Sequence, residues 1–300
     1  MLVKVFEYPS LYFNVVDTLE CGQVFRYKKI AENHYGVYSK DKYAELVQSG
    51  DKVEVFAEEK DKQYFWHYFD LDTDYSQIVE QIASVNDTMR QASGLGKGIR
   101  ILNQDLMEMI FSFIISANNN IKRIQQIVDK ICTGLGTKTQ YGYAFPTLEQ
   151  MSGAKVDFFA NVGAGYRDKY LVATAQKLLT YNLDELRQMT TKNAHKELLT
   201  FLGVGPKVAD CILLFGMHRG DVFPVDTWLK KAYHTFFEAG HADKDISNYF
   251  CGIFGQNSGL AQQYLFYFLR KSITRFRQAG KKPHLTHFLF FVRACSLPSS

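Results

Sequence analysis

The spacing of hydrophobic residues changes along the chain between residues 70 and 104. Up to about residue 70, short runs of β-branched and aromatic residues alternate with turn residues such as Ser49-Gly50-Asp51, a pattern typical of antiparallel strands. The expected strands cover residues 24–27, 35–38, 44–47 and 53–56. From about residue 104, apolar residues recur with the period of an α-helix. The pattern predicts an α+β protein, with an N-terminal antiparallel β-sheet domain at 1–92 and a helical domain at 93–300.

The helical part begins with two apolar faces on either side of Asn118-Asn119-Asn120. One face consists of Leu106, Ile110, Phe113 and Ile114, and the other of Ile121, Ile124, Val128 and Ile131. Further helices are expected at 167–180, 182–190, 194–201, 207–217, 227–238 and 259–278. The glycine-rich stretch 94–98 is expected to be a flexible connector, because it lacks the preceding strand and the third glycine of a dinucleotide-binding loop.

The segment Leu202-Gly203-Val204-Gly205-Pro206-Lys207 joins two of these helices. Its two glycines predict a helix-hairpin-helix at about 194–217, in which Gly203 and Gly205 are the candidate contacts to a DNA phosphate. Pro206 suits the first position of a helix, where no N–H donor is needed. Lys207 then lies in the first turn, where the positive end of the helix dipole disfavours an ammonium. A neutral amine in this place is a usable nucleophile.

A candidate carboxylate follows in Pro224-Val225-Asp226, just before another helical pattern. An amine and a carboxylate, each at a helix N-terminus beside a DNA-binding hairpin, are the parts of a lyase-type DNA glycosylase. Each residue also has an ordinary structural explanation. Similar turns join helices in proteins that do not bind DNA, most lysines are solvated, and Asp226 can simply cap its helix. The combination in this order and spacing favours catalysis.

Composition narrows the class of protein further. The net charge of +4 and the aromatic content of 15% are compatible with nucleic acid but do not require it. The cysteines are scattered, without a C-x-x-C pair or the four-cysteine run of an iron–sulfur cluster, which favours reduced thiols in the cytosol. They are Cys21, Cys132, Cys211, Cys251 and Cys295.

Asp70, Asp72 and Asp74 imitate half of a calcium loop, but a tyrosine replaces the glycine that this loop requires. We therefore expect no metal and no cofactor.

The chain shows no membrane signal. Its N-terminus lacks the apolar region of a secretory signal peptide. The longest apolar run, Met109–Ile115, is too short to cross a bilayer. A soluble cytoplasmic protein without a membrane partner is expected.

Six blocks in the chain, in order, make it resemble a known family of enzymes. They are Cys21-Gly22-Gln23-Val24-Phe25-Arg26, the run from Phe111-Ser112-Phe113 to Asn118-Asn119-Asn120-Ile121, Gly165-Tyr166-Arg167, the hairpin with Val208-Ala209-Asp210-Cys211, Pro224-Val225-Asp226, and Ala261-Gln262 to Phe266. The chain resembles the 8-oxoguanine DNA glycosylase/AP lyases first known from eukaryotes, within the helix-hairpin-helix superfamily. This resemblance implies an antiparallel sheet domain and two helical lobes with the active site between them. The compact N-terminus favours a bacterial or archaeal member.

The resemblance also implies a reaction. Lys207 would attack the anomeric carbon and form a Schiff base, and Asp226 would stabilise the oxocarbenium-like charge and help to move protons. The resemblance further implies that the partner is double-stranded DNA containing oxidised guanine and that the enzyme would act as a monomer. The damaged base would be flipped out, excised opposite cytosine, and the strand then cleaved by β-elimination.

Recognition of the base follows from the chemistry of the lesion. 8-Oxoguanine carries an oxygen on C8 and a hydrogen on N7, so a single acceptor aimed at N7 distinguishes it from guanine. By resemblance, this acceptor is the main-chain carbonyl of Gly22. Cys211 and Phe266 would sandwich the flipped base, and Gln262 would bond its Watson–Crick edge. Taken alone, these residues are more simply a turn glycine, two core residues and a surface glutamine.

Four residues are implied at the place that the base leaves. Asn118 would fill the gap and Tyr166 would wedge the stack, while Arg123 and Arg167 would bond the orphaned cytosine. The simpler alternatives are an inter-helix turn for the asparagines and phosphate contacts for the arginines.

Two positions depart from the eukaryotic pattern. Trp228 replaces a histidine near a DNA phosphate, and Leu269 replaces an aspartate, as though an apolar contact had replaced a polar pair. Two other functions remain open. A monofunctional glycosylase for alkylated bases would share the fold but lack Lys207, and a non-catalytic DNA-binding module would need neither Asp226 nor the base-stacking residues.

Overall fold

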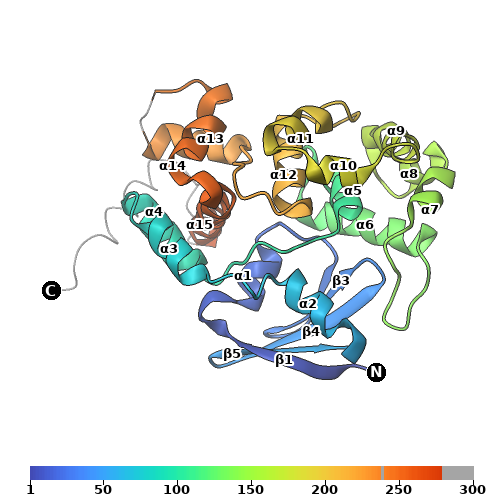
Figure 1. Cartoon of the computed structure of the whole chain (residues 1–300), viewed down its shortest axis with the longest axis horizontal. Helices are drawn as coiled ribbons and strands as arrows, with labels where there is room; N and C mark the ends of the chain where they lie inside the picture. Colours follow the sequence, from blue (N-terminus) through green and yellow to red (C-terminus); the bar gives the residue numbers. More distant parts are fainter. Residues whose placement is uncertain (238–239, 279–300) are drawn as a thin grey trace. The chain divides into compact units, whose positions relative to one another are not determined.

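The computed structural model describes residues 1–237 and 240–278, which divide into two compact units (Figure 1). Unit 1 comprises Met1–Thr73 and Arg100–Arg219, and unit 2 comprises Asp74–Ile99 and the residues from Gly220 on. The domain boundary expected between residues 92 and 93 does not coincide with this division. The reason is that helices α3 (Tyr75–Ala83) and α4 (Asp87–Gly96) pack together, and α4 packs along α15 (Ser258–Gln278).

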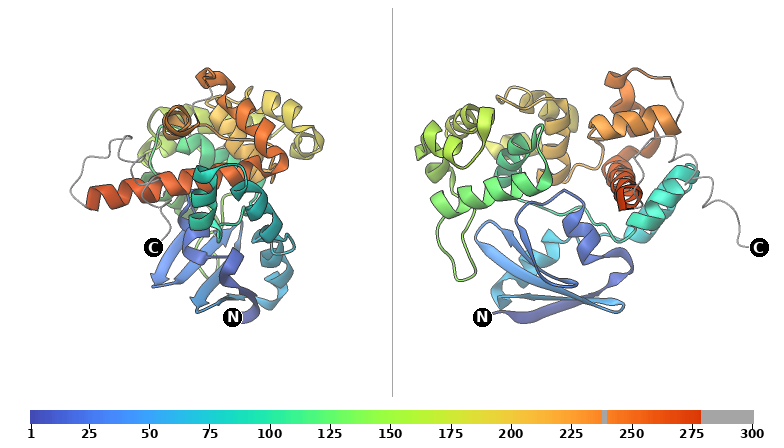
Figure 2. Two further views of the ribbon diagram at one scale, coloured as in Figure 1. Left: turned by 90° about the vertical axis from the view of Figure 1, so that its left-hand side faces the viewer. Right: turned by 180° about the vertical axis from the view of Figure 1, so that it is seen from behind.

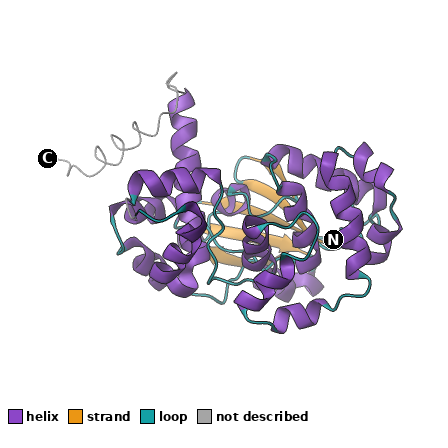
Figure 3. Ribbon diagram, turned by 90° about the horizontal axis from the view of Figure 1, so that it is seen from above, coloured by secondary structure: helices purple, strands orange, loops and turns teal. Residues whose placement is uncertain are grey.

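Unit 1 contains a five-stranded antiparallel sheet in the order β1-β5-β4-β3-β2 (orange in Figure 3). The strands are β1 (Val3–Pro9), β2 (Tyr27–Ala31), β3 (His34–Ser39), β4 (Lys42–Ser49) and β5 (Lys52–Ala57). The register pairs Val37 with Ala44 and Leu46 with Val55. All four side chains are buried, so the alternation of apolar and polar residues gives the sheet one face in the core.

Helices α1 (Val15–Glu20) and α2 (Lys62–Tyr68) share a core with this sheet (Figure 2). Rings from Phe13, Phe65 and Phe69 pack among the buried side chains of the strands. Arg100 is completely buried beside them, and its guanidinium donates to the carbonyls of Tyr12, Phe69, Asp70 and Thr73. A buried guanidinium is tolerated here because main-chain acceptors satisfy its donors.

The sheet differs from the sequence-based prediction in three places. The strand expected at 24–27 begins only at Tyr27, and the side chains of Phe25 and Arg26 are buried against Phe113 and Glu108 of α5 (Leu106–Ser116). Strand β1 was not among the expected strands, although it pairs with β5 along its length. The segment 62–68 forms helix α2 in a region where only strands were expected.

Unit 1 continues as a set of helices. They are α5 (Leu106–Ser116), α6 (Ile121–Leu135), α7 (Leu148–Gly153), α8 (Val156–Asn161), α9 (Asp168–Leu178), α10 (Leu183–Gln188), α11 (Thr191–Leu198) and α12 (Pro206–Gly216). Helix α5 packs along α12, where the rings of Phe113 and Phe215 stack with centroids 5.4 Å apart. The expected helices in this region are confirmed, with boundaries that shift by a few residues.

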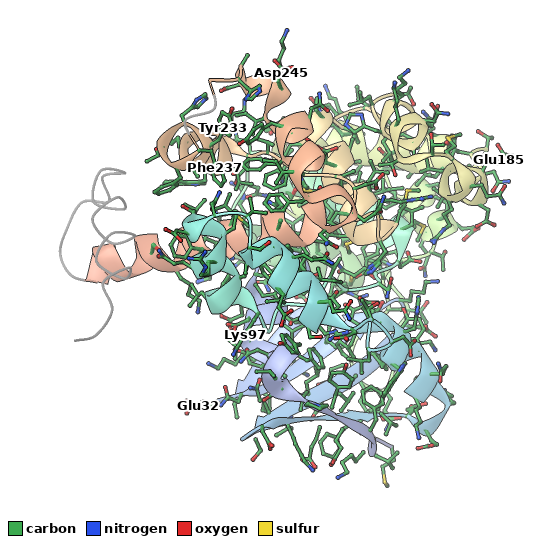
Figure 4. All side chains as sticks on the ribbon, turned by 60° about the vertical axis from the view of Figure 1, so that its left-hand side comes forward. Glu32, Lys97, Glu185, Tyr233, Phe237 and Asp245 are labelled. Atoms are coloured by element: carbon green, nitrogen blue, oxygen red, sulfur yellow. The ribbon has the colours of Figure 1, made fainter. Side chains whose placement is uncertain are left out.

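Unit 2 contains α3, α4, α13 (Thr227–Phe236), α14 (Ile246–Phe254) and α15. Its core includes Phe250, whose ring stacks on Phe223 at 4.2 Å and packs edge-on with Tyr233 of α13 and with Phe237, the residue after α13. Tyr233 and Phe237 are labelled in Figure 4. Helix α14 was not expected from the sequence. The connector expected at 94–98 is also wrong in part, because α4 runs through Gly96. A Cβ on Gly96 would lie 2.8 Å from the ring of Tyr264, so this glycine permits close helix packing.

Within residues 1–237 and 240–278, no helix combines the length and hydrophobicity needed to span a membrane. The same residues contain no group of three or more His, Cys, Asp or Glu side chains placed to hold a metal ion. The structure assigns no disulfide to the cysteines of these residues, at positions 21, 132, 211 and 251. Cys295 lies outside the described residues.

Candidate active site

Lys207 is the second residue of α12, in the hairpin where the sequence predicts it. The preceding Pro206 is the first helical residue, and Gly205 is the N-cap in an extended conformation. Lys207 is half-buried, with its Nζ 5.6 Å above the centroid of the Phe113 ring. The amine therefore faces an apolar ring at the beginning of a helix, a setting that suits a nucleophile better than a solvated surface position does.

Phe113 connects Lys207 to the segment that contains Gly22. Its ring stacks on Phe215 and meets Phe25 edge-on at a centroid distance of 5.5 Å. Phe25 lies three residues after Gly22. Cys211, one helical turn after Lys207, is buried on the same helix. Within unit 1, the candidate nucleophile is thus linked through one aromatic cluster to the segment predicted to recognise the base.

The segment around Gly22 is held by a buried glutamine that the sequence analysis did not single out. Gly22 has a φ of +98°, a conformation that favours glycine. The side chain of the next residue, Gln23, donates to the carbonyls of Thr18 (3.0 Å) and Arg100 (2.7 Å) and accepts from the N–H of Leu102 (2.9 Å). Gln23 is completely buried. A polar residue between Cys21 and Val24 was the available sequence signal, but its partners lie almost eighty residues away.

The motif residue Arg26 has a structural role. Its guanidinium pairs with Glu108 at 3.2 Å and donates to the carbonyls of Lys40 and Tyr143. Burial raises the pKa of the Glu108 carboxyl, and the positive charge of Arg26 opposes this shift. The pair joins the end of the motif to α5.

The hairpin itself is cross-linked by a histidine and an aspartate. His195 of α11 lies 3.3 Å from Asp210 of α12, three residues after Lys207. The hydrogen bond to Asp210 raises the pKa of His195, while burial raises the pKa of Asp210. The pair fixes the two helices of the hairpin to each other. Neither residue was predicted as part of the site.

Gly203 adopts a φ of +85°, as expected of a tight turn between helices. The Val204 N–H donates to the Phe201 carbonyl (3.0 Å), which closes the turn. The first hairpin helix ends at Leu198, slightly earlier than the expected residue 201.

The three asparagines after α5 have separate local roles. Asn118 has a φ of +49°, a left-handed conformation that asparagine tolerates better than most residues, and it is exposed. Asn119 donates to the Ile115 carbonyl (3.1 Å) at the end of α5. Asn120 caps α6 by accepting from the N–H of Arg123. The inter-helix turn is therefore real, and it leaves Asn118 exposed at its tip.

Tyr166 and Arg167 converge on the same turn. The Tyr166 hydroxyl and the Arg167 Nε donate to the Ala117 carbonyl at 3.2 and 2.9 Å. Arg167 is buried, and further donor groups bond the carbonyls of Ala164 and Asn118. Tyr166 is 55% exposed. Arg123 is also exposed and donates to the Gly163 carbonyl at 3.3 Å. Unit 1 therefore brings together all four residues predicted to occupy the gap and contact cytosine.

Asp226 is the N-cap of α13 in unit 2. One of its carboxylate oxygens, Oδ1, accepts from the N–H groups of Trp228 (3.0 Å) and Leu229 (2.8 Å). The capping role considered from the sequence is confirmed. Since both bonds use Oδ1, the cap fixes the carboxylate at the helix N-terminus through one of its two oxygens.

Gln262 and Phe266 lie one turn apart on α15. Gln262 is buried, contrary to the surface position that is usual for a helical glutamine, and its Oε1 accepts from the side chain of Gln263 (3.0 Å). Phe266 is only half-buried within a run of buried residues, and the guanidinium of Arg270 lies 5.9 Å from its ring centroid. The amide and the ring therefore share a face of the helix.

The two departures from the eukaryotic pattern have different environments. Leu269 is buried, whereas Trp228 is 42% exposed, with the Lys231 amine 5.2 Å from its ring centroid. Trp228 is thus an exposed aromatic residue beside a cation at the start of α13.

Over most of its length, the chain is similar to an 8-oxoguanine glycosylase/lyase from Clostridium acetobutylicum, whose crystal structure is a complex with double-stranded DNA containing cytosine opposite 8-oxoguanine. The identity is 37% and the TM-score 0.83, with 87% of this chain and 93% of that chain covered. An N-glycosylase/DNA lyase of Saccharomyces cerevisiae is 29% identical, with 72% and 66% covered. One from Arabidopsis thaliana is 33% identical, with 57% and 52% covered. The chain thus spans about two thirds of the length of the Saccharomyces cerevisiae relative and about half of the length of the Arabidopsis thaliana relative.

The family models divide the chain into two consecutive parts. Residues 111–250 match the HhH-GPD superfamily of base excision DNA repair proteins, which defines the class to which the hairpin and its lysine belong. Residues 5–110 match the N-terminal domain of 8-oxoguanine DNA glycosylase. The chain belongs to the 8-oxoguanine DNA glycosylase family of base excision repair enzymes.

Proposed function

We propose that this protein is a bifunctional DNA glycosylase/AP lyase that flips out and excises 8-oxoguanine opposite cytosine and then cleaves the strand. The observation that carries the proposal is the position of Lys207, half-buried against Phe113 in the first turn of the second hairpin helix. Such a lysine serves covalent chemistry, because an amine can replace the base at the anomeric carbon. The similar Clostridium protein, in complex with DNA containing 8-oxoguanine, supports the choice of lesion.

The reaction starts with the neutral amine of Lys207. Its lone pair forms a bond to C1′ as the bond to the base breaks, and the departing base takes the electron pair and a proton. The carboxylate of Asp226 stabilises the positive charge that develops on the sugar. Opening of the sugar ring leaves a Schiff base between Lys207 and C1′. Loss of a proton from C2′ then expels the 3′ phosphate by β-elimination.

Discrimination against guanine rests on the backbone at Gly22. Its carbonyl accepts the N7 hydrogen that only the oxidised base carries, and Gln23 keeps this peptide in place through its buried hydrogen bonds. Cys211 and Phe266 stack against the flipped base, and the amide of Gln262 bonds its Watson–Crick edge.

The turn around Asn118 recognises the base opposite the lesion. Asn118 fills the vacated position, Tyr166 wedges the stack, and the arginines donate to O2 and N3 of cytosine. The Arg167 guanidinium is already bonded to the carbonyls of this turn. Four of its five N–H donors are used in this way, so more than one bond from Arg167 to cytosine requires exchange of a bond to these carbonyls.

Borohydride trapping on a duplex with 8-oxoguanine opposite cytosine tests the proposal. The wild type should form a covalent adduct, and Lys207→Gln should bind the duplex without forming one. Lys196→Gln is the matched control, because Lys196 is an exposed lysine of the same hairpin. Equal trapping by Lys207→Gln and the wild type would show that another amine is the nucleophile. Excision by the wild type without any trapped adduct would identify a monofunctional glycosylase.

A further inference from the structure

One tyrosine contacts both the hairpin and the exposed aromatic residue next to the Asn118 turn. Tyr170, in the first turn of α9, occupies the space beside Gly203 where a side chain would otherwise lie. A Cβ on Gly203 would come within 2.4 Å of Cδ2 and 2.8 Å of Cγ of the Tyr170 ring. The same ring meets Tyr166 edge-to-face, with centroids 5.9 Å apart and planes at 76°.

Tyr166 is held on its other side by the turn that contains Asn118. Its hydroxyl donates to the Ala117 carbonyl, and the guanidinium of Arg167 lies 4.3 Å from its ring centroid. Tyr166 and Arg167 belong to the short 3-10 turn Gly165–Arg167 that leads directly into α9. The position of the exposed ring is therefore set by the Ala117 carbonyl, by Arg167 and by Tyr170.

These contacts form a continuous path from Gly203 through Tyr170 to Tyr166, entirely within unit 1. At the hairpin end of this path, the ring of Tyr170 lies directly against the backbone of Gly203, because this glycine, with a φ of +85°, has no side chain between them. A displacement of the hairpin backbone therefore pushes directly on the ring. An edge-to-face pair has a preferred geometry, so the displacement is passed on to Tyr166.

We propose that Tyr170 is a positioning residue that couples binding of a DNA phosphate at the Gly203 hairpin to insertion of Tyr166 into the base stack. This proposal rests on the proposed function, in which the hairpin binds phosphate and Tyr166 acts as the wedge. Tyr170 itself does not touch the damaged base. Its contribution is that phosphate binding and opening of the stack occur together instead of independently.

The test compares three variants with matched packing. Tyr170→Leu keeps an apolar side chain but removes the ring, and Tyr170→Phe keeps the ring but removes the hydroxyl. Tyr181→Leu is the control, because the Tyr181 ring packs edge-on against Phe201 of the same hairpin at 5.5 Å. Melting temperatures of all three establish that the proteins are folded under the conditions of the assay.

The readout is the fluorescence of 2-aminopurine placed next to 8-oxoguanine, which increases when the stack opens and does not require base excision. For Tyr170→Leu we expect stack opening to fall by about 2- to 10-fold, the range that one aromatic pair supplies, with affinity for undamaged duplex nearly unchanged. Tyr170→Phe and Tyr181→Leu should behave like the wild type.

A double-mutant cycle completes the test. If Tyr170 acts through Tyr166, adding Tyr170→Leu to Tyr166→Ala should cause no further loss of stack opening. Additive losses would overturn the proposal, as would an equal loss in Tyr181→Leu or a normal signal from Tyr170→Leu. Failure of the proposed function would look different, since the wild type would then open the stack without excising the base, or would not open it at all.

Discussion

Replacement of Gln23 by leucine tests whether the Gly22 peptide is positioned by buried hydrogen bonds. Leucine has a similar volume, so packing is largely kept while the amide is lost. The Arg100 carbonyl and the Leu102 N–H each lose a hydrogen bond, at 2.7 and 2.9 Å, within a fully buried site. The Thr18 carbonyl also loses a bond, but it still accepts from the thiol of Cys21 at 3.2 Å.

The cost follows from these partners. A buried group that loses its hydrogen bond costs about 1–3 kcal/mol, so the losses at Arg100 and Leu102 together predict destabilisation by about 2–6 kcal/mol. This is a large fraction of the stability of about 5–15 kcal/mol that is usual for a folded domain. The matched control is Gln104→Leu, which removes one bond, from Gln104 to the Gln23 carbonyl, and should cost about 1–3 kcal/mol, half of the loss predicted for Gln23→Leu.

Urea unfolding measures both variants, and single-turnover excision measures the function. Under conditions where Gln23→Leu remains folded, we expect slower excision of 8-oxoguanine and weaker discrimination against guanine, because the Gly22 carbonyl is no longer held. A Gln23→Leu protein with wild-type stability and wild-type excision would refute the reasoning. Lower stability with unchanged discrimination would limit Gln23 to a purely structural role.

Three further outcomes are expected. Asp226→Asn should lower the single-turnover rate by about 100-fold or more with little change in melting temperature, because asparagine caps a helix as well as aspartate does; a rate loss explained by unfolding alone would leave Asp226 only its cap. The raised pKa of His195 means that the folded protein binds more protons than the unfolded chain near and above pH 6.5, so the free energy of unfolding should fall as the pH rises above 6.5 and through the folded pKa of His195. Urea unfolding across this range should show a smaller fall in His195→Gln, and an equal fall in both proteins would contradict the assignment. In a Trp66→Phe protein, emission from the exposed Trp228 should change on binding duplex DNA, and unchanged emission at saturation would place Trp228 away from the DNA.

The sequence was most informative where local chemistry decides the structure. Pro206 marks a helix N-terminus because the first position of a helix needs no N–H donor. Asp226 marks another because its carboxylate accepts from two N–H groups of the first turn. Both positions are confirmed. The expectation that 94–98 is a connector was wrong in part, because α4 continues to Gly96 and the role of Gly96 depends on a ring from α15, far away in the sequence. Local composition shows a glycine but not what packs against it.

Polar residues with distant partners mark a similar limit. Gln23, Arg26 and His195 each act through a partner on another element, and no local pattern identifies such a partner. A sequence motif indicates that Gln23 and Arg26 occur together, whereas only the structure shows that Gln23 anchors the Gly22 segment. The residues predicted to do chemistry were therefore easier to name than the residues that hold them in place.

Arg167 shows how position changes the interpretation of a predicted role. The resemblance assigns Arg123 and Arg167 to the same cytosine, but their starting states differ. Arg123 is exposed and makes one long bond, at 3.3 Å, to a carbonyl, whereas Arg167 is buried with bonds to three carbonyls of its surroundings. Exchanging a bond of Arg167 for one to cytosine therefore yields less net free energy than a new bond from Arg123. On the proposed function, much of the contribution of Arg167 then lies in holding the Ala117 carbonyl, and with it Asn118 and Tyr166, in place.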